Sequence, residues 1–242
     1  MPRVEIKEIG EVKLNKPIII EGFPGVGMVG TISASYLSEN LGMKLIGYLT
    51  SNLFPPIAAI HDYKPVSPAR IYASEKHNLI VLFSEFVIPS EIVYPLSEKI
   101  IEWAKKKNAA AIYSLAGIAP ENPIDKIFGI ASNPAMGEKL KAGGIDLIKE
   151  GATQGVSGVL IAECASQNFP AANIMVQTNS PLDPGASAKL LDKLSELIGT
   201  KIDTKALSTE GKKIEGKMKE ALDKMKKMDA GYQELQRSPM YG

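Results

Sequence analysis

The sequence is poor in the residues that build disulfides and metal sites. It has one cysteine, Cys164, so it cannot form an internal disulfide, and its only histidines are His61 and His77. Neither a C-x-x-C pair nor an H-E-x-x-H helix is present, and we therefore expect no bound metal. No apolar run approaches the ~20 residues of a spanning helix, and no secretory leader precedes the first strand. These absences predict a cytoplasmic protein that does not insert into membranes.

An excess of charge of either sign is also missing. The 28 lysines and arginines nearly balance the 27 aspartates and glutamates, which leaves a net charge of +1. A chain without a strong overall field has no general attraction to nucleic acid or to an anionic membrane. We therefore expect its partners to be recognised through local patches, with nucleic acid not among them.

Short apolar runs alternate with longer helical patterns, which predicts an α/β fold: a three-layer α/β/α sandwich around a mostly parallel sheet. The expected strands are 17–21, 44–50, 69–73, 79–84, 110–115 and 126–131. The expected helices are 27–40, 90–107, 134–142, 156–166 and 184–198, the last with Asp183 as its cap and Pro184 in its first turn.

The composition changes near residue 205, where we place the end of the core domain, 1–205. An amphipathic helix is expected over 206–236, because Met218, Ala221, Met225, Met228, Tyr232 and Leu235 recur in steps of three and four. The methionines in this apolar seam are flexible and its alanine is small. We therefore expect the seam to pack on the core or on a neighbour rather than to form a stable isolated coiled coil. Residues 237–242 are expected to form a flexible docking tail.

Two glycine-rich turns suggest a possible ligand site. Gly25, Gly27 and Gly30 have the G-x-G-x-x-G spacing after a strand, and Gly151 to Gly158 form a second such turn. Backbone N–H groups at such a turn can cradle a phosphate. However, the second strand ends without the acidic residue that would hold a ribose, and no phosphate-binding lysine follows. We favour a structural role, in which the glycines permit tight turns and close helix packing.

Catalytic groups are not evident. Ser157 lies in the second glycine turn but has no base nearby in sequence, and His61, Asp62 and Glu85 lack a partner at a meaningful spacing. Cys164 lies on an apolar helix and is interpreted as a small core residue. We predict no catalytic residue and no cofactor.

The last three residues, Met240, Tyr241 and Gly242, place a hydrophobe and a tyrosine directly before the terminal carboxylate. A chain terminus can enter a blind pocket and present its carboxylate to a cation or to backbone N–H groups. Tyr241 would bury a ring of large area at low entropic cost. We predict these three residues as a partner-binding site, and the ending resembles the hydrophobic-tyrosine-any-residue tail with which proteasome activators and assembly chaperones dock.

Four separated segments resemble the PAC2 family, the relatives of proteasome assembly chaperone 2. They are Gly22 to Gly30, Phe54-Pro55-Pro56, Pro68 to Tyr72, and Gly151 to Gly158, within a resemblance that covers residues 4 to 205. The resemblance implies a phosphorylase-like α/β/α sandwich and an archaeal type of chaperone or activator that acts as a homo-oligomer. It implies that the tails occupy pockets between α subunits of the 20S proteasome, without catalysis.

Two other functions remain open. A nucleoside- or nucleotide-binding enzyme of phosphorylase-like fold would account for the glycine turns but not for the tail. A scaffold that binds other helices through the methionine-lined stripe would leave the terminus without a role.

Overall fold

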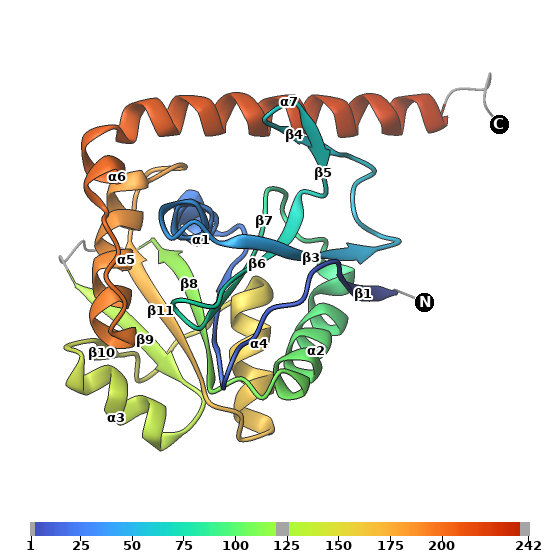
Figure 1. The fold of residues 1–242 in the computed structure, drawn as a ribbon. Coiled ribbons are helices and arrows are strands. Elements are labelled where there is room, and N and C mark those ends of the chain that lie inside the picture. The colour runs from blue at the N-terminus through green and yellow to red at the C-terminus, as the bar shows by residue number, and fades with distance from the viewer. Residues whose placement is uncertain (1–2, 120–125, 238–242) are drawn as a thin grey trace.

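The computed structural model describes residues 3–119 and 126–237 and has three layers (Figure 1). A nine-stranded sheet forms the middle layer. Its strands are β1 (Val4–Glu8), β2 (Ile18–Gly22), β3 (Lys44–Ser51), β6 (Ala69–Ser74), β7 (Leu79–Ser84), β8 (Ala111–Ile118), β9 (Ile127–Ala131), β10 (Asp146–Leu147) and β11 (Ala171–Gln177). The helices packed on the sheet are α1 (Val29–Asn40), α2 (Ser90–Lys106), α3 (Pro134–Ala142), α4 (Gly155–Ser166) and α5 (Pro184–Ile198). The predicted α/β sandwich is confirmed.

The sheet is mixed rather than mostly parallel, which corrects the expectation from sequence. Its strand order is β1-β3-β6-β7-β2-β8-β11-β9-β10. Neighbours from β7 to β11 run parallel, whereas β1, β3, β6 and β7 form an antiparallel half. Only the short turn 75–78 joins β6 to β7, and a turn of that length cannot cross over the sheet to make a parallel neighbour. The alternation of strands and helices in the sequence therefore led us to expect more parallel strand pairs than the sheet contains.

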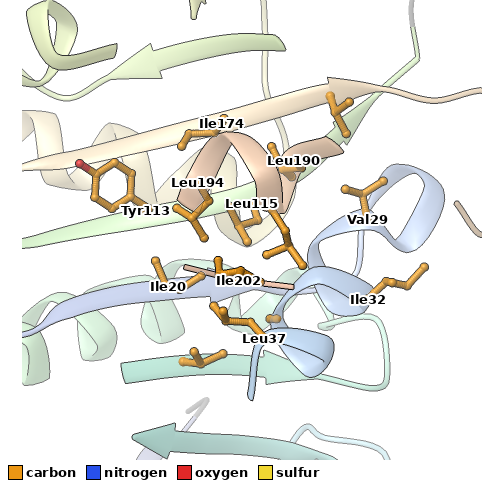
Figure 2. Packing of buried hydrophobic residues seen from close by; sticks show 14 of the residues in the cluster. Ile20, Val29, Ile32, Leu37, Tyr113, Leu115, Ile174, Leu190, Leu194 and Ile202 are labelled. Atoms are coloured by element: carbon orange, nitrogen blue, oxygen red, sulfur yellow. The ribbon is translucent and has the colours of Figure 1, made fainter. Parts of the chain in front are cut away.

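Two apolar cores lie on opposite faces of the sheet. Figure 2 shows the first, which includes Leu190 and Leu194 of α5, Ile32 of α1 and Ile174 of β11. The second core lies under α2 and α4, where Leu96 and Ile100 pack with other fully buried side chains. The two clusters explain why the central strands are apolar along their whole length, since both of their faces are covered.

The C-terminal part of the chain forms two further helices. The short α6 (Lys205–Thr209) leads into α7 (Gly211–Arg237), a helix of 27 residues. Ile214, Met218 and Leu222 pack against the first core, whereas the Met228 side chain is 59% exposed. The first half of α7 is thus attached to the core, and of the predicted seam Met218 takes part in this contact, whereas Ile214 and Leu222 were not predicted. In Figure 1, α7 runs along one side of the molecule and leads away from α5 and α6.

A small hairpin stands apart from the main sheet. Its strands, β4 (Ala59–His61) and β5 (Lys64–Val66), pair only with each other in the described part of the chain. Asp62 and Tyr63 form the two-residue turn with φ of 49° and 62°. Positive φ at both turn positions is typical of a type I′ hairpin, whose twist matches that of the strands. Figure 1 shows this hairpin projecting from the body.

Candidate functional site

The segments singled out in the sequence meet at one edge of the sheet. The edge is formed by the carboxyl ends of β2, β7, β8 and β11 and by the start of β6. Gly22 lies beside Phe83, and Phe83 lies beside Arg70. The Phe54 ring contacts the Phe86 ring edge to face, with centroids 4.8 Å apart. In open α/β sheets, ligands and partners bind preferentially at this edge, so its side chains define the candidate site.

The first glycine turn is filled by the protein itself. A Cβ atom on Gly30 would lie 2.4 Å from the Leu115 carbonyl oxygen, and one on Gly22 would lie 2.3 Å from the Gly30 oxygen. Gly27 has a φ of +65°, and a Cβ there would lie 2.7 Å from the Thr178 side chain. The close approach to β8 accounts for Gly30 and the approach to the loop after β11 accounts for Gly27, whereas a Cβ on Gly25 would meet nothing within 4 Å. The structural role favoured from the sequence therefore fits the packing of Gly27 and Gly30.

The second glycine turn packs in a similar way at the start of α4. A Cβ on Gly158 would lie 2.7 Å from the Thr153 carbonyl carbon, whereas Gly155 has open space and a φ of +73°. The glycines therefore let the chain fold tightly over the first turn of α4. The neighbouring Ser157 donates a hydrogen bond to Glu21, with its Oγ 2.9 Å from the Glu21 Oε2 atom.

Glu21 is a carboxyl group buried in this edge with no cation beside it in the described residues. It is fully buried and accepts a hydrogen bond of 2.8 Å from the Phe23 N–H group. Burial raises the pKa of Glu21, and hydrogen bonds from Ser114, Phe23 and Ser157 oppose that rise only in part. Its neighbours across the sheet continue a polar row, because Ser114 lies beside Glu21 and Asn173 lies beside Ser114. This polar row was not predicted from the sequence. The glutamate near the end of the apolar strand β2 was the feature that could have indicated it.

The buried carboxyl group should make stability depend on pH. The ordinary pKa of Glu21 is 4.5 and the folded protein raises it, so its contribution is fully present below pH 4.5 and is lost as pH rises through the folded pKa. Glu21→Gln keeps an acceptor for Phe23 and cannot ionise. We expect the free energy of unfolding of the variant, relative to that of the unsubstituted protein, to increase above pH 4.5 by at most about 1.4 kcal/mol per pH unit.

Urea denaturation at a series of pH values from 4 to 8 measures this difference. Glu102→Gln is the matched control, because Glu102 is an exposed residue of α2 that pairs with Lys99 on the surface. If the free energies of unfolding of Glu21→Gln and of the unsubstituted protein differ by the same amount at every pH, Glu21 is not the source of the pH dependence.

A cluster of ionic side chains connects the hairpin to the body. The His61 Nε2 atom lies 2.8 Å from the Glu85 Oε1 atom, and the same oxygen forms an ion pair with Arg70. Arg70 is 4% exposed and stacks over the Phe83 ring, 5.1 Å from its centroid. Sequence reasoning considered His61 and Glu85 without finding their partner, which the fold supplies as Arg70. A charged residue inside an apolar strand was the available signal.

These contacts join the hairpin to the body of the protein. Arg70 and Glu85 lie in the body and His61 in the hairpin, so the contact between His61 and Glu85 connects the two parts, and the ion pair with Arg70 holds Glu85 in place. Ser157 is bound to Glu21 and not to a histidine. Cys164 is buried, which raises its pKa to about 12, as suits the core position predicted for it. His77 lies in the turn after β6.

Two further findings concern the described residues, 3–119 and 126–237. Within them, no three side chains of His, Cys, Asp or Glu gather as metal ligands would. Over the same residues, every helix is too short or too polar to cross a membrane.

The predicted partner-binding residues, Met240, Tyr241 and Gly242, lie outside the described residues. The described chain shows what precedes them, which is α7 up to Arg237. On its exposed surface the Lys224 Nζ atom lies 2.6 Å from the Glu220 Oε1 atom, and the two residues are one helical turn apart.

Comparison with known proteins places this chain in a family. The PAC2 family model matches residues 19–222. The uncharacterized protein MJ0106 of Methanocaldococcus jannaschii is 31% identical over 222 residues, which cover 91% of this chain and 92% of that protein.

Two crystal structures from Pyrococcus furiosus extend the comparison. PbaA, described as an archaeal homolog of proteasome-assembly chaperone, is 28% identical, with a TM-score of 0.83 and coverage of 93% of this chain and 99% of that chain. PbaB, described as an archaeal proteasome activator, shares the fold, with 18% identity, a TM-score of 0.75 and coverage of 90% of this chain and 98% of that chain. The chain belongs to the PAC2 family.

Proposed function

We propose that this chain is a proteasome assembly chaperone or activator, which docks its C-terminal tail into pockets between α subunits of the 20S proteasome. The observation that supports this most directly is the likeness to PbaA, at 28% identity over 93% of the chain. That likeness extends over nearly the whole of both chains. It therefore includes the candidate site as well as the core that supports it.

The position of α7 supports the use of the tail. The first half of the helix is held on the core by Ile214, Met218 and Leu222, and the helix then continues to Arg237. A helix anchored at one end projects whatever follows it. Met240 would pack at the rim of the pocket, Tyr241 would fill the groove, and the Gly242 carboxylate would pair with a pocket lysine.

Multiple copies would strengthen a weak contact. A single tail of three residues buries little surface, and linking several tails on one oligomer raises the overall affinity by a factor of about 10² to 10⁴. The proposed function therefore includes self-association of this chain. It also places the protein in the cytoplasm, where a proteasome partner would be found.

Co-sedimentation with a purified archaeal 20S proteasome tests the proposal. The full-length chain should sediment with the particle, at a ratio that saturates as the protein is added. A chain that stays in the supernatant at every concentration would contradict the proposal.

The alternative of a nucleotide-binding enzyme finds little support in the packing of the glycine turns. A ligand at a hundred times its dissociation constant stabilises a protein by ~2.7 kcal/mol. We expect no shift of the unfolding temperature with nucleosides or nucleotides at millimolar concentration. A reproducible shift of several degrees with one of them would favour the enzyme.

A further inference from the structure

The connection from α5 to α6 is held against α1 by three hydrogen bonds to a single backbone residue. The Tyr36 hydroxyl group donates to the Asp203 carbonyl oxygen at 2.7 Å. The Asn40 Nδ2 atom donates to the same oxygen at 3.2 Å, and the Asp203 N–H group donates to the Asn40 Oδ1 atom at 3.3 Å. Tyr36 and Asn40 lie at the end of α1, 167 and 163 residues before Asp203. We call these three residues the Asp203 contact.

The Asp203 contact fixes the orientation of the backbone as well as its position. A single hydrogen bond lets a peptide group swing about it, whereas the Asn40 amide pairs with both the N–H and the C=O group of Asp203. The residues on either side are buried, since Ile202 is 7% exposed and Thr204 is 9% exposed. The chain therefore passes α1 in one defined direction.

This direction is passed on to the start of α6. The Asp203 Oδ1 atom accepts a hydrogen bond of 3.1 Å from the N–H group of Lys205, the first residue of α6. The Thr204 hydroxyl group donates to the Asp192 Oδ1 atom of α5 at 2.7 Å. The beginning of α6 is thus attached to both α1 and α5.

The corner between α6 and α7 is closed by backbone hydrogen bonds. Glu210 is the one residue between the two helices, and its N–H group donates to the Ala206 carbonyl oxygen at 2.8 Å. Its carbonyl oxygen accepts from the N–H groups of Lys213 and Ile214 at 2.9 and 3.0 Å. Because Glu210 is bonded to both helices, a change in the heading of α6 must appear in the heading of α7.

The apolar contacts of α7 do not define its heading by themselves. Ile214, Met218 and Leu222 pack against the first core, but apolar contacts are non-directional and methionine adapts its shape to its surroundings. Hydrogen bonds at the base of the helix are directional. The heading matters because α7 has 27 residues and is about 40 Å long, so a tilt of about 15° at its start moves its far end by about 10 Å.

We propose that Tyr36 and Asn40 are positioning residues, which set the heading of α7 through the Asp203 contact and thereby determine where the end of the chain is delivered. The second part of this inference rests on the proposed function, in which the chain end docks. A pocket that takes a tail needs the tail at one place. A wider range of α7 headings therefore lowers the effective concentration of the second and later tails of an assembly.

A distance measurement on the full-length chain tests the heading directly. Spin labels on Glu98→Cys of α2 and Lys227→Cys of α7 report the distance between two exposed positions by double electron–electron resonance. Cys164 is buried, so the introduced cysteines are the reactive thiols, and dilution into unlabelled chain restricts the signal to one copy. With the Asp203 contact intact we expect one narrow distribution of distances. Tyr36→Phe combined with Asn40→Ala removes the three hydrogen bonds and should shift or widen this distribution by at least about 5 Å.

Asn78→Ala is the matched control. Asn78 makes the same two-point contact in the turn before β7, where its Oδ1 atom accepts from the Asn15 N–H group at 3.0 Å and its Nδ2 atom donates to the Asn15 carbonyl oxygen at 2.7 Å. Its φ is 52°, so alanine there also strains the backbone. The control should lower the unfolding temperature and leave the distance distribution unchanged.

Circular dichroism verifies that the control and the double variant are folded. A folded Tyr36→Phe, Asn40→Ala variant with an unchanged distribution would overturn the inference. A control variant that changes the distribution equally would also overturn it, because the effect would then follow from lost stability alone.

Binding to the 20S proteasome separates this inference from the proposed function. The double variant keeps residues 240–242, and we expect it to bind an immobilised particle about tenfold more weakly than the unsubstituted chain. A changed distance distribution with full binding would overturn the role of Tyr36 and Asn40 in delivering the chain end. If the unsubstituted chain does not bind the particle, the proposed function is wrong, whereas the distance measurement still decides whether these two residues set the heading of α7.

Discussion

Removal of Met240, Tyr241 and Gly242 is expected to reduce binding to the 20S proteasome by on the order of a hundredfold or more. Each copy loses its docking group, so the loss is multiplied over the assembly. Surface plasmon resonance with immobilised proteasome measures the affinity before and after truncation. The truncation leaves α7 and the core intact, and the unfolding temperature should not change.

Two matched variants show whether the order of the tail and its free end matter. Met240→Tyr combined with Tyr241→Met keeps the composition but moves the ring one position from the end. Addition of one alanine after Gly242 keeps every side chain but displaces the carboxylate. Both should bind about as weakly as the truncated chain. Full binding by either variant would contradict docking through a penultimate tyrosine and a terminal carboxylate.

Gly30→Ala is expected to destabilise the fold by about 3 kcal/mol or more, which lowers the unfolding temperature by roughly 6 to 12 °C. A Cβ at this position would lie 2.4 Å from the Leu115 carbonyl oxygen and 2.9 Å from the Phe23 oxygen. Both are backbone atoms, so α1 must move away from β8 to accommodate the methyl group. Differential scanning calorimetry measures the change.

The control is the same substitution in another helix. Gly216 lies in α7, and a Cβ there would meet nothing within 4 Å. Alanine is a better helix former than glycine, so Gly216→Ala should leave the stability unchanged or raise it by up to about 1 kcal/mol. Equal effects of the two substitutions would show that close packing of α1 is not the reason for Gly30.

The sequence predicted the helices better than the sheet. The five expected core helices correspond to α1 to α5. The helices α2 and α5 each have one apolar face, and Asn133 and Asp183 mark the starts of α3 and α5. The strand β11 was missed, since Ala171, Ala172 and Asn173 do not resemble a strand with large apolar side chains. The strand β1 was missed because it is a short edge strand in which Val4 is buried and the residues toward Glu8 are increasingly exposed. The direction of pairing depends on connections that local periodicity does not encode.

The candidate site could be predicted only in part for a similar reason. The glycine turns were visible because their spacing is local. The partners of Glu21 and His61 come from Ser157 and Glu85, which are 136 and 24 residues away along the chain. Contacts at such separations depend on the sheet order, and this order was not available from the sequence. A charged residue within an apolar strand nevertheless indicates a buried partner, and both Glu21 and Arg70 fit that description.

The length of α7 sets a reach and a direction for the residues beyond it. The 16 residues from Leu222 to Arg237 span about 22 Å at the rise of an α-helix. Each added or removed residue turns the exit point by about 100° around the helix axis. An insertion of seven residues would lengthen this spacer by about 10 Å and keep its heading, whereas an insertion of two would aim the chain end almost backwards. The number of residues in α7 therefore sets the direction in which the chain leaves the helix.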